Sequence, residues 1–129
     1  MASTLPSPPS PEETSIDGRH PETPSSLPLS PARQALVDDI IALYCCHPTR
    51  DRILRYTPDC VYDDQFVHAD DRYKVAEQWF AQPQLFESST NEGYQVVRSD
   101  SKVIQFIIQQ VRLLPSRLVH FITQTNAAR

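Results

Sequence analysis

The feature that most constrains the fold of this 129-residue chain is a change in apolar spacing near residue 90. Before that point, apolar side chains recur at helical intervals, and after it they follow the alternation of extended strands. Helices come first and strands that are neighbours in the sequence follow. This order favours an α+β protein with an antiparallel sheet over a parallel sheet built from alternating units.

The first predicted helix begins at Ser30-Pro31, since serine is a good N-cap and proline suits the first helical position. His47-Pro48 ends it, because a residue before proline avoids the helical region. One apolar stripe follows this helix, formed by Leu36, Ile40, Leu43 and Tyr44.

Two further helices are predicted. Thr49 can cap a short helix over residues 50–56, and Asp70 or Asp71 can cap a third helix from Arg72 to Gln82, where Pro83 breaks or kinks it. The predicted extended segments are Cys60 to Asp64, Phe66 to His68, Thr90 to Ser99, Val103 to Leu114 and Leu118 to Thr123.

Residues 1–31 differ in composition from the rest of the chain. They hold eight of the twelve prolines and seven serines, with few large apolar residues. Such a segment cannot bury enough surface to offset its ordering entropy, so we expect a disordered leader before a folded domain over 32–129. The leader contains four minimal sites for proline-directed phosphorylation: Ser7-Pro8, Ser10-Pro11, Thr23-Pro24 and Ser30-Pro31. A merely solubilising leader would show the same dipeptides.

Charge and hydropathy exclude several function classes. The net charge is −4, and no Lys/Arg cluster offers a track for phosphates, so no nucleic-acid partner is expected. No apolar run is long enough to span a membrane, and the N-terminus lacks a secretory pattern. Three cysteines without CxxC spacing fit a reducing compartment, so we expect a cytoplasmic protein.

The order of these segments resembles the nuclear transport factor two-like superfamily, and within it the SnoaL-like polyketide cyclase and ketosteroid isomerase relatives. The resemblance covers about residues 33–123. It is carried by the helix pair, by "YTPDCVYDDQF", by a helix with "VAEQWF" and by the long strands after it. Relatives often place proline after the aspartate of the short strand, whereas Gln65 follows Asp64 here.

The resemblance implies a cone-like roll, in which three helices pack on a bent antiparallel sheet and enclose a pocket. It implies a small apolar ligand and no cofactor. Since relatives continue with further strands, the resemblance also implies a domain that lacks its last strands. The residues expected to line the pocket are Leu36, Ile40, Tyr62, Trp79, Phe106 and Ile108.

By the same resemblance, Asp64 would be a general base that moves a proton beside a carbonyl. Tyr44 would donate a hydrogen bond to the developing oxyanion. An apolar pocket raises the pKa of a carboxyl group toward the range that suits proton transfer. We therefore expect Asp64 in a dry hollow, in an isomerase or cyclase without cofactor.

Three alternatives stay open at this point. The domain could be a non-catalytic interaction module that forms a homodimer through the sheet face of Val103 to Leu114, or a shortened product without activity. The acidic stretch "DCVYDDQFVHADD" over 59–71 could also bind metal, but its spacing fits neither an EF-hand nor HExxH, so no metal site is predicted.

Overall fold

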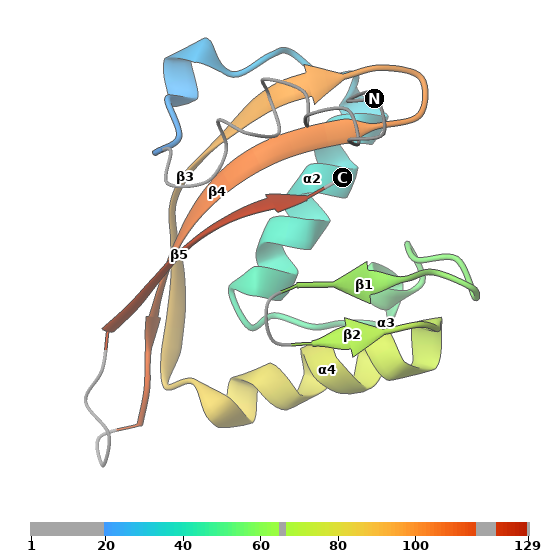
Figure 1. Ribbon diagram of the computed structural model, residues 1–129, viewed down its shortest axis with the longest axis vertical. Helices are drawn as coiled ribbons and strands as arrows, with labels where there is room; N and C mark the ends of the chain where they lie inside the picture. The colour runs from blue at the N-terminus through green and yellow to red at the C-terminus, as the bar shows by residue number, and fades with distance from the viewer. Residues whose placement is uncertain (1–19, 65–66, 116–120, 129) are drawn as a thin grey trace, which may run out of the picture.

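The computed structural model describes residues 20–64, 67–115 and 121–128, with the backbone alone for 121–128. Figure 1 shows a curved sheet with α2 against it and α4 crossing near one end. The elements in chain order are the 3-10 turn η2 (Thr23–Ser25), α2 (Pro31–Tyr44), α3 (Arg50–Ile53), β1 (Tyr62–Asp63), β2 (His68–Ala69), α4 (Arg72–Leu85), β3 (Ser88–Ser99), β4 (Ile104–Leu113) and β5 (Phe121–Ala128).

Two antiparallel sheets are present in the described chain, so the predicted α+β class is confirmed. The larger sheet has the order β3-β4-β5, and the smaller one is the β1–β2 hairpin, in which Tyr62 lies opposite Ala69. Register shifts interrupt the β3–β4 pairing at Asn91/Gly93 and at Val96/Arg98. Such bulges bend a strand and increase its twist, in agreement with the curvature of β3 and β4 in Figure 1.

Side-chain caps start each of the three α-helices of the described chain. Ser30 Oγ accepts the Arg33 N–H at 3.4 Å, Thr49 Oγ1 accepts the Arg52 N–H at 3.2 Å, and Asp71 Oδ1 accepts the Lys74 N–H at 2.7 Å. The predicted caps at Ser30 and Thr49 are confirmed, and Asp71 is the cap of the third helix.

The end of α2 is a left-handed turn at a residue other than glycine. The His47 N–H donates to Ala42 O and the Cys46 N–H to Leu43 O, both at 3.0 Å. Cys46 has a φ of 64°, the left-handed conformation that this type of helix end requires. The helix therefore stops at Tyr44, a few residues before the predicted end at His47-Pro48.

Two predicted helix ends are wrong. The third helix continues through Pro83 to Leu85, and the Phe86 N–H still donates to Gln82 O at 3.1 Å. Because Pro83 lies in the last turn, it removes one backbone hydrogen bond without disrupting a long helix beyond it. The second helix ends at Ile53, and the chain continues as turns to Tyr56.

The predicted disorder is wrong for residues 20–31. Residues 20–30, here called the strap, run along the free edge of β3, and Pro31 already belongs to α2. The Leu27 N–H donates to Val96 O at 3.0 Å, and the Val96 N–H donates to Ser26 Oγ at 2.8 Å. The strap needs no core of its own because a sheet edge supplies its partners. The rest of the predicted leader, residues 1–19, lies outside the described residues.

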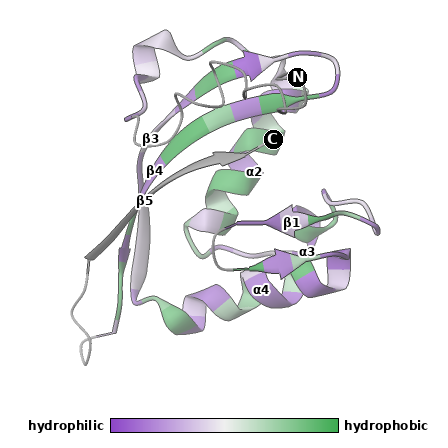
Figure 2. Cartoon of the chain, in the orientation of Figure 1, coloured by the Kyte–Doolittle hydropathy of each residue, from purple (hydrophilic) through white to green (hydrophobic). Residues whose placement is uncertain are grey.

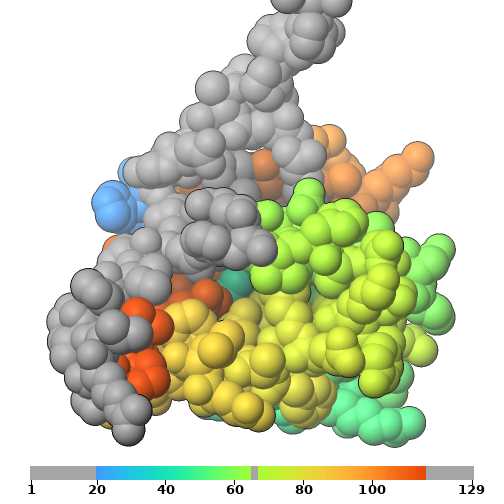
Figure 3. Space-filling view, turned by 60° about the horizontal axis from the view of Figure 1, so that its bottom comes forward, coloured from blue at the N-terminus to red at the C-terminus, as the bar shows by residue number. Residues whose placement is uncertain are grey.

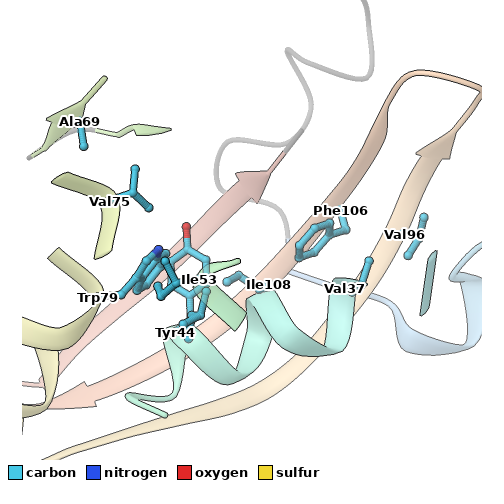
Figure 4. Close-up of a cluster of buried hydrophobic side chains, with 10 residues drawn as sticks. Val37, Tyr44, Ile53, Ala69, Val75, Trp79, Val96, Phe106 and Ile108 are labelled. Atoms are coloured by element: carbon cyan, nitrogen blue, oxygen red, sulfur yellow. The ribbon is translucent and has the colours of Figure 1, made fainter. Parts of the chain in front are cut away.

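An apolar core formed by described residues joins the helices to the sheet. Figure 2 shows hydrophobic residues along β4 and α2 and mixed character along α4, and Figure 4 shows the buried side chains between these elements. The core consists of Val37, Leu43, Tyr44, Ile53, Ala69, Val75, Trp79, Val96, Phe106 and Ile108.

The strand predicted as a dimer surface, β4, is the central strand of its sheet. All side chains from Gln105 to Ile108 are buried, on both faces of the strand. The broad exposed face expected over Val103 to Leu114 is therefore not observed, and homodimer formation stays a prediction.

Replacing Trp79 tests the core. Its side chain is 0% exposed, so we expect Trp79→Ala to lower the free energy of unfolding by about 3–5 kcal/mol. The neighbouring Phe80 is 47% exposed and provides the matched control, for which Phe80→Ala should cost less than about 0.5 kcal/mol. Urea unfolding followed by circular dichroism measures both, and equal losses would contradict this core.

Candidate functional site

The structure divides the predicted ligand-binding and catalytic residues between two places. Leu36, Ile40 and Phe106 line a hollow beside α2. Tyr44, Tyr62, Trp79 and Asp64 form a separate group of rings and hydrogen bonds near α4. Ile108 is 1% exposed and belongs to the core. The single pocket expected from the sequence is thus not observed among the described residues.

The hollow, here called the α2–β4 hollow, has a volume of about 250 Å³ and lies between the first half of α2 and the turn-proximal end of β4. Its apolar lining comes from two directions, because helical spacing turns one stripe of α2 toward the sheet and strand alternation turns Ile104 and Phe106 toward the helix. The lining residues are Arg33, Leu36, Val37, Ile40, Lys102, Ile104 and Phe106.

Two cations accompany these apolar residues. Arg33 Nη1 donates to Ser99 Oγ at 2.8 Å, which ties the side chain to the end of β3. Within the described residues, neither Arg33 nor Lys102 takes part in an ion pair. The α2–β4 hollow therefore combines an apolar surface with positive charge that no carboxylate neutralises in this part of the chain.

Two other hollows are less suited to a ligand. One of about 150 Å³ lies between α2 and α3, and its carboxylate, Asp39, is already paired with Arg52 at 3.2 Å and Arg55 at 2.8 Å. A larger one of about 430 Å³ is an open depression beside α4, where Asp71 is engaged as the helix cap. Figure 3 shows the α4 side of the molecule, where α4 and the β1–β2 hairpin lie side by side on the surface.

Rings fill the space where the resemblance implies a dry hollow. Tyr44 and Tyr62 both meet Trp79 edge to face, with ring centroids 5.0 Å and 5.4 Å apart. Trp79 Nε1 donates to the Tyr56 hydroxyl at 3.3 Å. Such edge-to-face pairs stabilise a core by more than the apolar area that they bury. The packed rings occupy the space in which a ligand would have to bind.

A chain of hydrogen bonds links the predicted oxyanion donor to the predicted base. The Tyr62 hydroxyl donates to Asp64 Oδ2 at 2.8 Å, and the Tyr44 and Tyr62 hydroxyl oxygens are 3.3 Å apart. Because the single hydroxyl proton of Tyr62 goes to Asp64, Tyr44 is the donor to Tyr62. Burial is the main cause that raises the pKa of both Tyr44 and Tyr62, so the two phenols stay protonated at neutral pH.

Asp64 lies at the surface. Its side chain is exposed, and Oδ1 accepts the Val67 N–H at 2.8 Å. The expectation of a carboxylate in a dry hollow is wrong, because Trp79 and the two tyrosines occupy the interior beside it. Strand alternation turns Tyr62 inward and Asp63 outward, where Asp63 Oδ1 lies 3.4 Å from His68 Nδ1. The assignment of Asp64 as a base and Tyr44 as an oxyanion donor stays a prediction.

Sequence reasoning missed four polar residues that matter for the site and its support: Arg33, Lys102, Gln110 and Arg112. Arg33 lies about one helical turn before Leu36, and Lys102 lies two residues before Ile104. Helix and strand spacing could therefore have placed both cations beside the hollow. Gln110 and Arg112 continue the inward alternation of Phe106 and Ile108, so their burial could have been predicted from the period of the strand.

Comparison with protein-family models, with curated proteins and with solved structures gives no match for this chain. No helix in the described part of the chain has the length and apolar character needed to cross a membrane. Within the same residues, no three side chains among His, Cys, Asp and Glu come together in a way that could hold a metal ion.

Ionisation of the Tyr56 phenol should make the stability of the fold depend on pH in the alkaline range. Burial raises its pKa from 10.0 to about 12, so the unfolded state loses the proton first and stability falls as pH rises through this window. We expect the free energy of unfolding of the native chain, minus that of Tyr56→Phe, to decrease by about 2 kcal/mol from pH 9 to 11.5. Urea unfolding at both pH values measures it, and a constant difference would show that Tyr56 ionises alike in both states.

Proposed function

We propose that this chain is a small-molecule-binding domain of SnoaL-like architecture, whose ligand is a small apolar molecule with one acidic group. The ligand binds in the α2–β4 hollow. The observation that carries the proposal is an apolar lining, formed by residues such as Leu36 and Phe106, next to two cations without an ion-pair partner in the described chain.

The size of the hollow limits the ligand. Liquid water takes about 30 Å³ per molecule, so a volume of about 250 Å³ corresponds to roughly eight waters. A short aliphatic or single-ring carboxylic acid matches this volume, whereas a steroid or a large polyketide does not. Arg33 and Lys102 favour a carboxylate on the ligand, and guanidinium groups pair well with that group.

Binding without proton transfer is the form of the proposal that the geometry supports best. Asp64 is exposed, holds the Tyr62 hydroxyl and a backbone N–H, and is not among the lining residues of the α2–β4 hollow. A general base acts only within hydrogen-bond reach of the proton that it removes. Support for an enzyme would require a ligand beside Asp64, in a place that the rings of Tyr62 and Trp79 occupy.

The proposal is tested by titrating the protein with hexanoate or with the neutral 1-hexanol and following the backbone chemical shifts by NMR. We expect hexanoate to bind in the millimolar range, about −4 kcal/mol, which is about −0.5 kcal/mol per non-hydrogen atom and within the usual limits for small ligands. Saturable shifts should centre on Leu36, Ile40 and Ile104. Hexanol should bind about two- to fivefold more weakly, because partly exposed charge pairs contribute up to about 1 kcal/mol.

Variants locate the site. The double variant Arg33→Gln, Lys102→Gln should bind hexanoate no more tightly than hexanol, and Leu36→Glu should abolish binding of both. Asp64→Asn is the matched control and should bind as the native chain does. Saturable shifts centred on Tyr62 and Asp64, or no saturable shifts at all, would overturn the proposal.

A further inference from the structure

The strap covers the outer edge of β3 with hydrogen bonds along its length. The Glu22 N–H donates to Gln95 Oε1 at 2.9 Å, and Thr23 Oγ1 donates to Tyr94 O at 3.3 Å. Ser26 and Leu27 bind the Val96 N–H and C=O, as described above. The strap thus supplies partners to three backbone groups on the edge of β3, namely Tyr94 O, the Val96 N–H and Val96 O.

Thr23 is the strap residue whose hydroxyl lies closest to the β3 backbone at Gly93. A Cβ atom placed on Gly93 would lie 3.5 Å from Thr23 Oγ1, so the hydroxyl occupies the side of β3 that a side chain would otherwise cover. Gly93 has a φ of +154° and lies at a register shift of β3. A Cβ atom at this position would be in ordinary van der Waals contact with Thr23 and Pro21, so the strap packs directly on β3 here.

We propose that Thr23 is a phosphorylation site for a proline-directed kinase and that its modification releases the strap from β3. The dipeptide Thr23-Pro24 supplies the minimal recognition pattern, and the Thr23 side chain is exposed. The kinase transfers the γ-phosphoryl group of ATP to Oγ1. An O–P bond forms at Thr23, the bond to the β-phosphate breaks, and ADP and the hydroxyl proton leave.

The contacts of Thr23 oppose a phosphate in the docked position. Phosphorylation removes the proton that Oγ1 donates to Tyr94 O, and it places about two negative charges beside that carbonyl oxygen and next to Glu22. Rotation of the phosphorylated side chain toward solvent relieves the crowding against β3, but it does not restore the hydrogen bond to Tyr94 O, which is lost with the hydroxyl proton. Release of the segment from Glu22 to Leu27 is favoured in both cases, since hydrogen bonds to β3 hold that segment, whereas Leu29 is packed against the apolar core.

The second described site, Ser30-Pro31, has the opposite electrostatic setting. Ser30 is the N-cap of α2, a helix of fourteen residues, and its Oγ accepts the Arg33 N–H. A phosphate at a helix N-terminus is stabilised by the helix dipole and by free backbone N–H groups. A charge at residue 30 therefore provides a matched control within the same segment.

The experiment treats the full chain with a proline-directed kinase and ATP, maps the phosphates by mass spectrometry, and then follows amide hydrogen exchange by NMR. We expect phosphate on Thr23 and exchange of the Val96 and Leu27 amides at least about tenfold faster, with the amides of β4 unchanged. Thr23→Ala treated in the same way carries phosphate only at other sites and should exchange at the same rate as the untreated Thr23→Ala variant.

Substitutions distinguish the effect of added negative charge at residue 23 from the effect of losing the Thr23 hydroxyl. Thr23→Glu should accelerate exchange at Val96 and Leu27 more than Thr23→Val does, and Ser30→Glu should not accelerate it. The proposal is overturned if the kinase leaves Thr23 unmodified, if phosphorylated chains exchange at the native rate, or if treated Thr23→Ala shows the same acceleration.

Discussion

The junction between the last turn of α2 and the second half of β4 fixes the rest of the structure. Gln110 is 0% exposed, and its amide donates to Tyr44 O at 3.3 Å and to Ser89 Oγ at 2.9 Å, while the Ser89 hydroxyl donates to Tyr44 O at 2.6 Å. A helix end leaves such carbonyls without partners, and a buried one is costly unless it is satisfied. A slip of β4 by one residue would turn Gln110 to the other face, so this bond set ties the helix to one register of the sheet. It also holds the Tyr44 ring against Trp79 of α4.

The same junction explains how a cation is buried without a carboxylate partner in the described part of the chain. Arg112 is 6% exposed; its Nη2 donates to Gln82 Oε1 at 3.5 Å, and its Nε has no hydrogen-bond partner among the described residues. The guanidinium lies over Phe86 at 4.9 Å and Tyr44 at 5.6 Å from the ring centroids. Because Tyr44 ends α2 and Phe86 follows the end of α4, the charge lies near the negative ends of two helix dipoles. Helix ends and ring faces thus supply the stabilisation that an acidic partner would otherwise provide.

Prediction from the sequence succeeded where one local interaction decides the outcome, and failed where a distant part of the chain decides it. The caps at Ser30 and Thr49 depend on a hydroxyl three residues from its N–H donor, and strand spacing placed β3 and β4 within a few residues of their observed ends. The order of the strap depends on an edge strand about seventy residues away, which composition cannot reveal. The expected dry pocket failed for a similar reason. Whether Tyr62 and Trp79 leave space beside Asp64 is a matter of three-dimensional packing, and here the rings fill it.

The two ends of α2 differ in a way that sets where ligands and modifications can act. At its C-terminal end, Tyr44 is buried, and the neighbouring polar groups bind one another, so a ligand would have to displace satisfied hydrogen bonds. At its N-terminal end, Leu36 and Ile40 are only half-buried, and the cations Arg33 and Lys102 face no carboxylate among the described residues. The strap joins α2 at this same end, through the cap at Ser30. Binding and release at the N-terminal end therefore leave the Gln110 junction intact, and the fold can tolerate both.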